Sequence, residues 1–461
     1  MEVIHLHPLD CMGRLFAKVL LSTQIVFVSA IHLTPQGILR LRQPGGKRLP
    51  GSSRFFKFNL PHSHRYALFS FSALAIMGLV GCASFPKIQP YSSLPGQTQQ
   101  DQTVVVISTQ VQTQAPAQSS TLSNPDTPGI HLAWFYKPPA TYLDSLPNDY
   151  DFFILTHNDE TARDRLKSLG AKGPILQYLL LSEIMDPGSC NASPNNDQVA
   201  FQPGDYCWIQ SNFPDWFLTG SNGDILGKGQ YSVMDPGNRG WQNFWLQRAS
   251  FLQKTFNWDG IFLDNVEASL SKLAEWGQQP GAYPDDASYQ AAIEGELKWL
   301  YTSYFHPNGI PVYANIIAIR DPQVFLRYLQ YLDGAMLENF ATGWPTDAGL
   351  SDAEWEQQMQ MAEQAQALGK TVILVSQGSQ YDQQSEEFAL ASYLLVSDGL
   401  AYFRYTNQNN YEEIWNYANE KTDLGKPLGP RYQVGQSWKR DFTKGTVIVD
   451  PTARTASITT H

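Results

Sequence analysis

Short apolar runs alternate with amphipathic stretches between residues 130 and 405. Each run is too short for a helix and suits a buried parallel strand. The runs predict strands over residues 131–137, 151–157, 174–183, 261–263, 311–316, 333–340, 371–376 and 400–405. Apolar residues at helical spacing predict helices over residues 158–169, 238–256, 285–305, 351–368 and 385–397. Strands that alternate with helices in this way predict an α/β fold, a (β/α)₈ TIM barrel.

An open, doubly wound sheet is the main alternative to the barrel. The nucleotide-binding versions of that fold carry a Gly-rich phosphate loop after the first strand, and none follows residues 131–137. Farther along, residues 429–460 combine turn residues with short β-prone runs. We therefore expect a barrel domain over residues 130–425 and a small C-terminal β segment over residues 426–461, packed on the barrel.

The N-terminal region has a different pattern. Residues 66–80 are apolar, follow a basic segment and end in Leu79-Val80-Gly81-Cys82. The apolar run is short for a membrane-spanning helix and typical of a signal peptide. The segment resembles a bacterial lipoprotein signal, which implies that residues 1–82 are an N-terminal extension and signal peptide and that a lipidated Cys82 becomes the first residue of the mature protein. The alternative is an ordinary hydrophobic segment with an unrelated cysteine. Residues 1–50 have no clear role, and we expect translation to begin nearer residue 50; the alternative is a genuine long signal or a first membrane anchor.

Residues 83–129 are rich in Gln, Ser, Thr and Pro and carry almost no charge. Such a segment cannot bury enough apolar area to offset the loss of chain entropy. We expect a disordered linker that holds the barrel away from a membrane. Together with the lipidation signal, it predicts an extracytoplasmic protein that is anchored to the cell membrane through Cys82.

The charge is distributed unevenly along the chain. The net charge is -11, but residues 1–65 contain nine Lys/Arg and two Asp/Glu, so the remainder carries 23 basic and 41 acidic residues. An acidic body argues against nucleic acid as a partner. All twelve Trp lie after residue 130. A Trp-rich, weakly charged domain suits a neutral polyhydroxylated ligand that stacks on aromatic rings, although most single Trp residues belong to cores.

Two predicted strands repeat one pattern. One reads Asp259-Gly260-Ile261-Phe262-Leu263-Asp264-Asn265 and the other Asp333-Gly334-Ala335-Met336-Leu337-Glu338-Asn339. In a barrel this places Asp264 and Glu338 at equivalent heights, at the carboxyl ends of strands, where TIM-barrel active sites lie. Glycosidic bond cleavage uses two such carboxyl groups. We assign Asp264 as nucleophile and Glu338 as general acid/base, with exchanged roles as the alternative.

Other polar or aromatic residues lie near predicted strand ends and could line a sugar site, although each alone suits a structural role equally well. They are Tyr136, His157, Glu183, Glu267, Asn315, Trp344, Gln377 and Arg404. Glu183 or Glu267 could also replace either carboxylate of the pair. The histidines after residue 130 show no metal-ligand spacing, and no Gly-x-Ser-x-Gly elbow occurs. We expect no cofactor and no metal.

Residues 184–237 read as one long loop, and loops of that length are usually functional. The loop contains Cys190 and Cys207. Outside the cytoplasm the two cysteines could form a disulfide that closes it, and the alternative is a pair of free thiols.

A family resemblance adds to these inferences. The stretch Trp258-Asp259-Gly260-Ile261-Phe262-Leu263-Asp264-Asn265-Val266 resembles the fourth-strand motif of bacterial glycoside-hydrolase-like barrel families related to the endo-α-1,4-polygalactosaminidases. Ser232-Val233-Met234-Asp235-Pro236-Gly237-Asn238 is similar to the segment before that strand, and the tail around Trp438 and Gly445 is similar to their C-terminal closure. The resemblance implies a TIM barrel that hydrolyses the glycosidic bonds of an extracellular polysaccharide. A non-catalytic sugar-binding lipoprotein on a degenerate barrel is the alternative.

Overall fold

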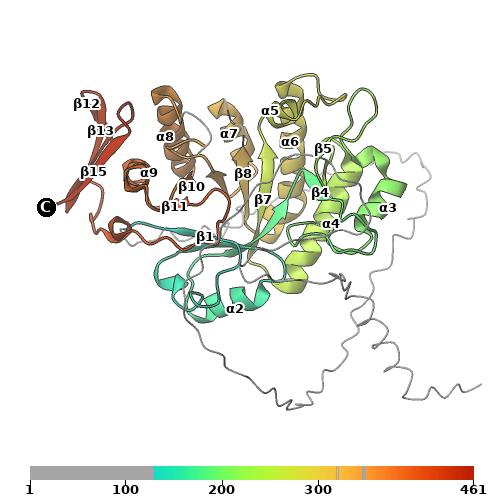
Figure 1. The fold of residues 1–461 in the computed structure, drawn as a ribbon, viewed down its shortest axis with the longest axis horizontal. Coiled ribbons are helices and arrows are strands. Elements are labelled where there is room, and N and C mark those ends of the chain that lie inside the picture. Colours follow the sequence, from blue (N-terminus) through green and yellow to red (C-terminus); the bar gives the residue numbers. More distant parts are fainter. Residues whose placement is uncertain (1–128, 318, 320, 345–348) are drawn as a thin grey trace, which may run out of the picture. The chain divides into compact units, whose positions relative to one another are not determined.

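The computed structural model describes residues 129–461 except 318, 320 and 345–348 (Figure 1). The predicted signal peptide, the lipidation site at Cys82 and all but the last residue of the predicted linker lie outside the described residues. Among the helices that are described, none is long and apolar enough to cross a bilayer.

Eight parallel strands form the central sheet, and their spatial order follows their order in the chain. They are β1 (Ala133–Phe135), β2 (Phe152–Leu155), β3 (Ile175–Leu180), β7 (Gly260–Glu267), β8 (Val312–Ile317), β9 (Gly334–Leu337), β10 (Thr371–Gln377) and β11 (Ala401–Thr406). The last strand returns to the first: Leu132 bridges Phe403, and the Phe403 N–H donates to the His131 carbonyl at 2.8 Å. The sheet is therefore a nearly closed barrel, and the predicted (β/α)₈ fold is confirmed.

Helices connect successive strands and cover the outside of the barrel (Figure 1). The α-helices are α2 (Glu160–Ser168), α3 (Asp205–Asn212), α4 (Arg239–Phe256), α5 (Ser271–Glu275), α6 (Asp286–Leu300), α7 (Pro322–Leu329), α8 (Asp352–Ala367) and α9 (Gln383–Val396). Shorter turns of helix are η1 (Leu146–Asn148), η2 (Pro214–Trp216), η3 (Tyr301–Phe305), η4 (His306–Asn308) and η5 (Ala418–Lys421). Of these, η3 is a π-helical turn that continues α6.

Two sequence predictions were wrong in detail. The helix predicted from residue 158 begins later, at Glu160, because Asn158 has a φ of 77°, in the left-handed region. Residues 184–237 are not a single loop. They contain α3, η2 and a three-stranded sheet of β4 (Glu183–Met185), β5 (Gly227–Lys228) and β6 (Tyr231–Val233). These strands have only two or three residues each, too few for a periodic pattern. Helix α7 was not predicted either.

Successive side chains of each barrel strand point to opposite faces of the sheet, and this gives two apolar layers. One group of side chains fills the barrel interior: Ala133, Phe135, Phe152, Ile154, Leu176, Tyr178, Leu180, Phe262, Tyr313, Met336, Ile373, Val375 and Tyr402. The other faces the surrounding helices. Side chains two residues apart on a strand lie on the same face. Asp264, Asn315 and Glu338 each lie two residues after an interior residue (Phe262, Tyr313 and Met336), so they also face the interior, at the carboxyl end of the barrel.

The C-terminal segment forms a separate antiparallel sheet of β12 (Tyr432–Val434), β13 (Ser437–Phe442), β14 (Gly445–Asp450) and β15 (Thr455–Thr460). This sheet packs on α9 (Figure 1). It is the small β appendage that the sequence predicted.

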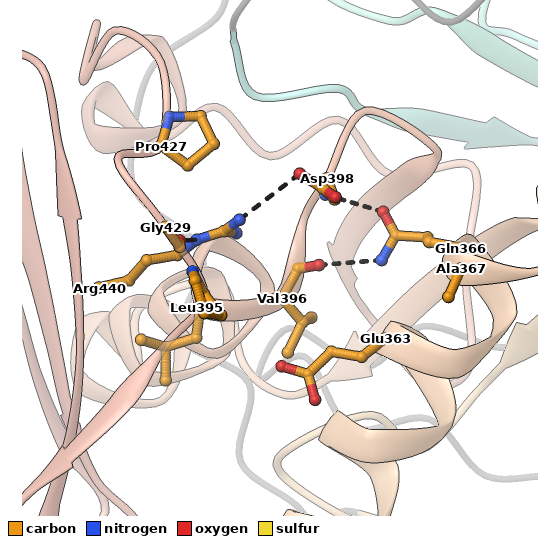
Figure 2. Close-up of a pocket in the computed structure, with 10 residues that line it drawn as sticks. Glu363, Gln366, Ala367, Leu395, Val396, Asp398, Pro427, Gly429 and Arg440 are labelled. Atoms are coloured by element: carbon orange, nitrogen blue, oxygen red, sulfur yellow. Dashed lines mark hydrogen bonds and ion pairs between the residues drawn. The ribbon is translucent and has the colours of Figure 1, made fainter.

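Buried arginines fasten the appendage to the barrel. The Arg440 guanidinium donates to the carbonyls of Gly429, Leu394 and Ser397 at 2.7–3.1 Å. It also lies 3.6 Å from Asp398, beside an open cavity of about 440 Å³ (Figure 2). Arg431 forms ion pairs with Glu356 and Glu363 on α8. The charged groups around this cavity already have protein partners, so we assign it to attachment of the appendage and not to chemistry.

Candidate active site

A β-bulge in β7 positions Asp264. Leu263 pairs with Ala314 and Val266 pairs with Ile316, so Asp264 and Asn265 together lie opposite Asn315 alone. Asn265 has a φ of 57°, a left-handed conformation that Asn tolerates better than most residues. Bulges re-aim side chains and are frequent beside active sites. Here the bulge falls at the residue that the sequence singled out as nucleophile.

Neighbouring backbone and side chains hold this bulge. The Leu181 N–H donates to the Asp264 carbonyl at 3.1 Å, and the Ser182 hydroxyl donates to the Asn265 carbonyl at 2.9 Å. The Asn265 side-chain amide donates to Glu183 at 3.2 Å. The chain between β3 and β4 therefore fixes the backbone from which the Asp264 side chain projects.

One amide brings the two predicted catalytic carboxylates together. The Asn315 Nδ2 donates to Asp264 Oδ1 at 2.9 Å and to Glu338 Oε2 at 2.7 Å. Two oxygens at 2.9 and 2.7 Å from one nitrogen can lie no more than 5.6 Å apart. The two carboxylates therefore face one small space at the carboxyl end of the barrel.

A tyrosine hydroxyl also donates to each carboxylate. Tyr178, from β3, donates to Asp264 Oδ2. Tyr411, from the segment after β11, donates to Glu338 Oε1 at 2.7 Å and accepts from Gln377 Nε2 at 2.5 Å. Burial raises the pKa of Tyr178 and of Tyr411 well above the usual value for tyrosine, so both hydroxyls stay protonated.

The surroundings of Glu338 favour its protonated form. Burial raises the pKa of Glu338, and the nearby charge of Asp264 acts in the same direction. The hydrogen bonds from Asn315 and Tyr411 oppose the shift, because they stabilise the carboxylate. The pKa is raised on balance, which keeps a proton available at Glu338 beside a second carboxyl group.

The space around the pair is narrow. Its walls are formed by Phe135, Tyr136, Ile154, Tyr178, Phe262, Asp264, Asn315, Met336, Glu338 and Tyr411. The volume is about 30 Å³, room for about two waters. The half-buried Tyr136 ring contacts the rings of Tyr178 and Tyr411, at centroid distances of 5.6 and 6.1 Å. Tyr136 has a φ of 64°, a strained conformation of the kind that gathers at functional sites.

Two further predicted residues form an ionic cluster beside the pair. Lys272 Nζ lies 2.9 Å from Glu183 Oε1 and 3.1 Å from Glu267 Oε1. Burial raises the pKa of Glu267 to about 7, against the opposing effect of Lys272. Both glutamates are buried and occupied by this lysine. Neither lines the cavity that contains Asp264 and Glu338.

The remaining predicted site residues lie in different places. Arg404 donates to the carbonyls of Tyr411 and Glu413, and its guanidinium lies 4.4 Å from the centre of the Trp134 ring. Like Gln377, it positions the segment that carries Tyr411. His157 lies 2.9 Å from Glu160, and its ring contacts the Phe256 ring at a tilt of 53°, outside the cavity.

Trp344 is half-buried in the segment after β9, and it does not line the cavity either. The sequence argument did not single out Tyr178, Tyr411, Lys272 or Asp197. A tyrosine inside the apolar run of β3 was the one local signal for Tyr178, because its hydroxyl needs a partner when it is buried.

The structure joins Cys190 and Cys207 by a disulfide, with Cα atoms 5.7 Å apart. The bridge links the segment after β4 to α3 and closes a loop that includes Asp197. Burial raises the pKa of Asp197, and the charges of Asp264 and Glu183 add to the effect. Among the described residues, no group of three or more His, Cys, Asp or Glu side chains is placed to hold a metal ion.

A TIM barrel with acidic side chains at the carboxyl ends of its strands is the architecture of many glycoside hydrolases. The chain belongs to the family described as hypothetical glycosyl hydrolase family 15, whose model matches residues 168–446. The resemblance seen in the sequence is thereby confirmed at the level of the family.

The solved structures that match this chain include two glycoside hydrolases. The glycoside hydrolase domain of PelA from Pseudomonas aeruginosa is 18% identical over 62% of this chain and 98% of that chain, with a TM-score of 0.42. A noncanonic maltogenic alpha-amylase, AmyB from Thermotoga neapolitana, is 12% identical over 70% of this chain and 86% of that chain, also with a TM-score of 0.42. The sequence matches no curated protein.

Proposed function

We propose that the protein is a retaining glycoside hydrolase that cleaves an extracellular polysaccharide with Asp264 as nucleophile and Glu338 as general acid/base. The observation that carries the proposal is the shared Asn315 amide, which holds one oxygen of each carboxyl group within 5.6 Å of the other. Retaining enzymes place their carboxyl groups about 5–5.5 Å apart, and inverting enzymes leave about 6.5–9.5 Å for a water molecule.

The first step transfers the sugar to the enzyme. The Asp264 carboxylate attacks the anomeric carbon while Glu338 gives its proton to the glycosidic oxygen. The bond between that carbon and that oxygen breaks, which leaves a glycosyl ester on Asp264 and a neutral alcohol. The raised pKa of Glu338 keeps the proton available for this step.

The second step releases the sugar. Glu338, now a carboxylate, removes a proton from a water that attacks the same carbon, and Asp264 departs as a carboxylate. The hydrogen bonds from Tyr411 and Asn315 stabilise Glu338 in this charged form. Because the space around the pair holds only about two waters, a sugar ring enters only when side chains that line the space move.

A hydrolysis screen tests the proposal. The purified protein is incubated with neutral, acidic and cationic polysaccharides, and new reducing ends are measured. We expect cleavage of at least one polymer, loss of it in Asp264→Asn and Glu338→Gln, and normal turnover in the exposed control Glu275→Gln. Binding of a polymer without cleavage would instead identify a non-catalytic sugar-binding barrel. Wild-type turnover in either carboxylate variant would reject that residue's role.

We further propose that Cys82 carries the lipid that anchors the protein outside the cytoplasm. The motivation is the order of basic segment, apolar run and Leu79-Val80-Gly81-Cys82. Mass spectrometry of the membrane-extracted protein should find an acylated N-terminal Cys82. An unmodified Cys82 inside an intact mature chain would contradict the anchor without affecting the hydrolase assignment.

A further inference from the structure

A polar groove lies next to the narrow space around the carboxylate pair. Thr156, Pro194, Asn195, Asn196 and Asp197 line it, and its volume is about 360 Å³. Ligand pockets usually measure about 300–1,000 Å³, whereas the space around the pair measures about 30 Å³. A polysaccharide that is cleaved at the pair must therefore place its neighbouring sugar units in a wider region of this kind.

Asp197 connects the groove to the carboxylate pair. Its carbonyl accepts a hydrogen bond from the Leu180 N–H at 2.9 Å, and Leu180 is the register partner of Asp264 in the barrel sheet. The Asp197 charge also contributes to the raised pKa values of Tyr136 and Tyr178, which both line the space around the pair. Asp197 therefore lies one hydrogen bond and one strand pairing away from Asp264, at the carboxyl end of the barrel.

The polar side chains of the groove are held in place. Asp197 Oδ1 accepts from Gln198 Nε2 at 2.8 Å, and the fully buried Gln198 in turn accepts from the Met185 N–H at 2.9 Å. Asn195 Nδ2 donates to the Tyr231 hydroxyl at 3.0 Å. The fixed positions lower the entropic cost of binding a ligand.

Two more constraints act on the same loop. Asn158 Nδ2 donates to Asn196 Oδ1 at 2.8 Å, and the Cys190–Cys207 disulfide closes the loop. The groove therefore has a covalent tie as well as hydrogen bonds to two neighbouring segments.

We propose that this groove is a sugar-binding subsite, in which Asp197 accepts hydrogen bonds from the hydroxyl groups of a sugar unit adjacent to the one that is cleaved. The proposal rests on the proposed function and extends it from bond cleavage to substrate selection. A carboxylate and two side-chain amides match the donors and acceptors of a polyhydroxylated ring. The five residues that line the groove include no basic side chain, so a phosphate or sulfate group gains no ion pair there.

Kinetics on substrates of different length test the subsite. Oligosaccharides of two to eight units are prepared from the polymer that the wild type cleaves, and Asp197→Ala, Asp197→Asn and the control Asp224→Ala are compared. Asp224 is an exposed residue of a turn that does not line the groove. We expect Asp197→Ala to raise KM about 10-fold for long substrates, because a hydrogen bond to a charged group is lost, and to leave the shortest substrate unchanged. Asp197→Asn, whose amide oxygen can still accept from Gln198, should show a smaller effect on KM and keep the wild-type thermal midpoint.

The outcomes separate this proposal from the hydrolase assignment. Equal effects on short and long substrates, or no effect on either, would overturn the subsite while leaving the hydrolase intact. If the wild type cleaves no polymer, affinity gel electrophoresis with the same polysaccharide panel replaces kinetics. Retardation that Asp197→Ala weakens would then support the subsite and contradict the hydrolase. An absence of both cleavage and retardation would count against both proposals.

Discussion

Two regions of the molecule bury charged side chains, and they do so in opposite ways. At the junction with the C-terminal sheet each buried arginine has partners of complementary character: Arg431 has two glutamates, and Arg440 has three carbonyls. At the carboxyl end of the barrel, the carboxyl groups of Asp264 and Glu338 share a single neutral amide.

The two arrangements suit different roles. The arginines at the junction are neutralised or hydrogen-bonded by protein groups, so they are suited to attaching the C-terminal sheet to the barrel. Burial and the neighbouring Asp264 charge raise the pKa of Glu338, which costs stability and keeps a proton ready for transfer. Replacements in the two regions should therefore have separate effects, on turnover in one and on stability in the other.

The largest expected effect concerns Glu338. Replacement by Gln removes the transferable proton but keeps the size and one acceptor, so kcat should fall about 10²–10⁴-fold while the protein stays folded. The matched replacement Glu356→Gln, at the junction, should keep wild-type kcat. Steady-state kinetics with circular dichroism on both variants checks the contrast. Equal losses in the two variants would show that the regions do not differ in this way.

The second effect concerns Arg431. Replacement by Met leaves two glutamates without their cation, and we expect a loss of about 2 kcal/mol in the free energy of unfolding. Breaking a buried pair costs about 3–5 kcal/mol, but these glutamate side chains are 25% and 36% exposed, which weakens the interaction. Chemical denaturation measures the loss, and kcat of the folded protein should not change. A large fall in kcat at full stability would contradict the assignment of the junction.

The third effect concerns Tyr411. Its hydrogen bond favours the charged form of Glu338, so Tyr411→Phe should raise the pKa of Glu338 further. We expect kcat to fall about 10-fold, because the carboxylate formed in the first step loses a donor. The alkaline limb of the pH–rate profile should move to higher pH. A shift of this limb to lower pH would exclude the proposed role of the hydroxyl.

The smallest effect concerns stability and pH. Because folding raises the pKa of Glu338, the stability that its protonated form contributes is present below the ordinary glutamate pKa and is lost as pH rises through the folded-state value. Glu338→Gln lacks this titration, so its stability relative to the wild type should increase with pH. Denaturation at several pH values measures the difference, and a constant difference would rule out the raised pKa.

Sequence reasoning identified the parts of this site that alternation along a strand determines. The matched apolar runs before Asp264 and Glu338 predicted that both side chains face the barrel interior at the carboxyl ends of their strands. The run in β8 predicted the same for Asn315. Sequence reasoning missed Tyr411, because the position of that residue depends on how the segment after β11 folds back over the barrel. The folding of this segment also gives Gln377 and Arg404 their contacts. Both were predicted to bind substrate; in the structure Gln377 donates to the Tyr411 hydroxyl, and Arg404 donates to the carbonyls of Tyr411 and Glu413.

Azide rescue tests the roles of the two carboxylates most directly. Asp264→Ala and Glu338→Ala are given an activated aryl glycoside of the sugar that the screen identifies, together with sodium azide, and the product is analysed by proton NMR. Azide can fill the space of the missing nucleophile in Asp264→Ala and should yield a glycosyl azide of inverted anomeric configuration. In Glu338→Ala, azide attacks the glycosyl ester on Asp264 and should yield a glycosyl azide of retained configuration. Retained product from Asp264→Ala and inverted product from Glu338→Ala would exchange the roles, and wild-type hydrolysis without azide in both variants would contradict the carboxylate pair altogether.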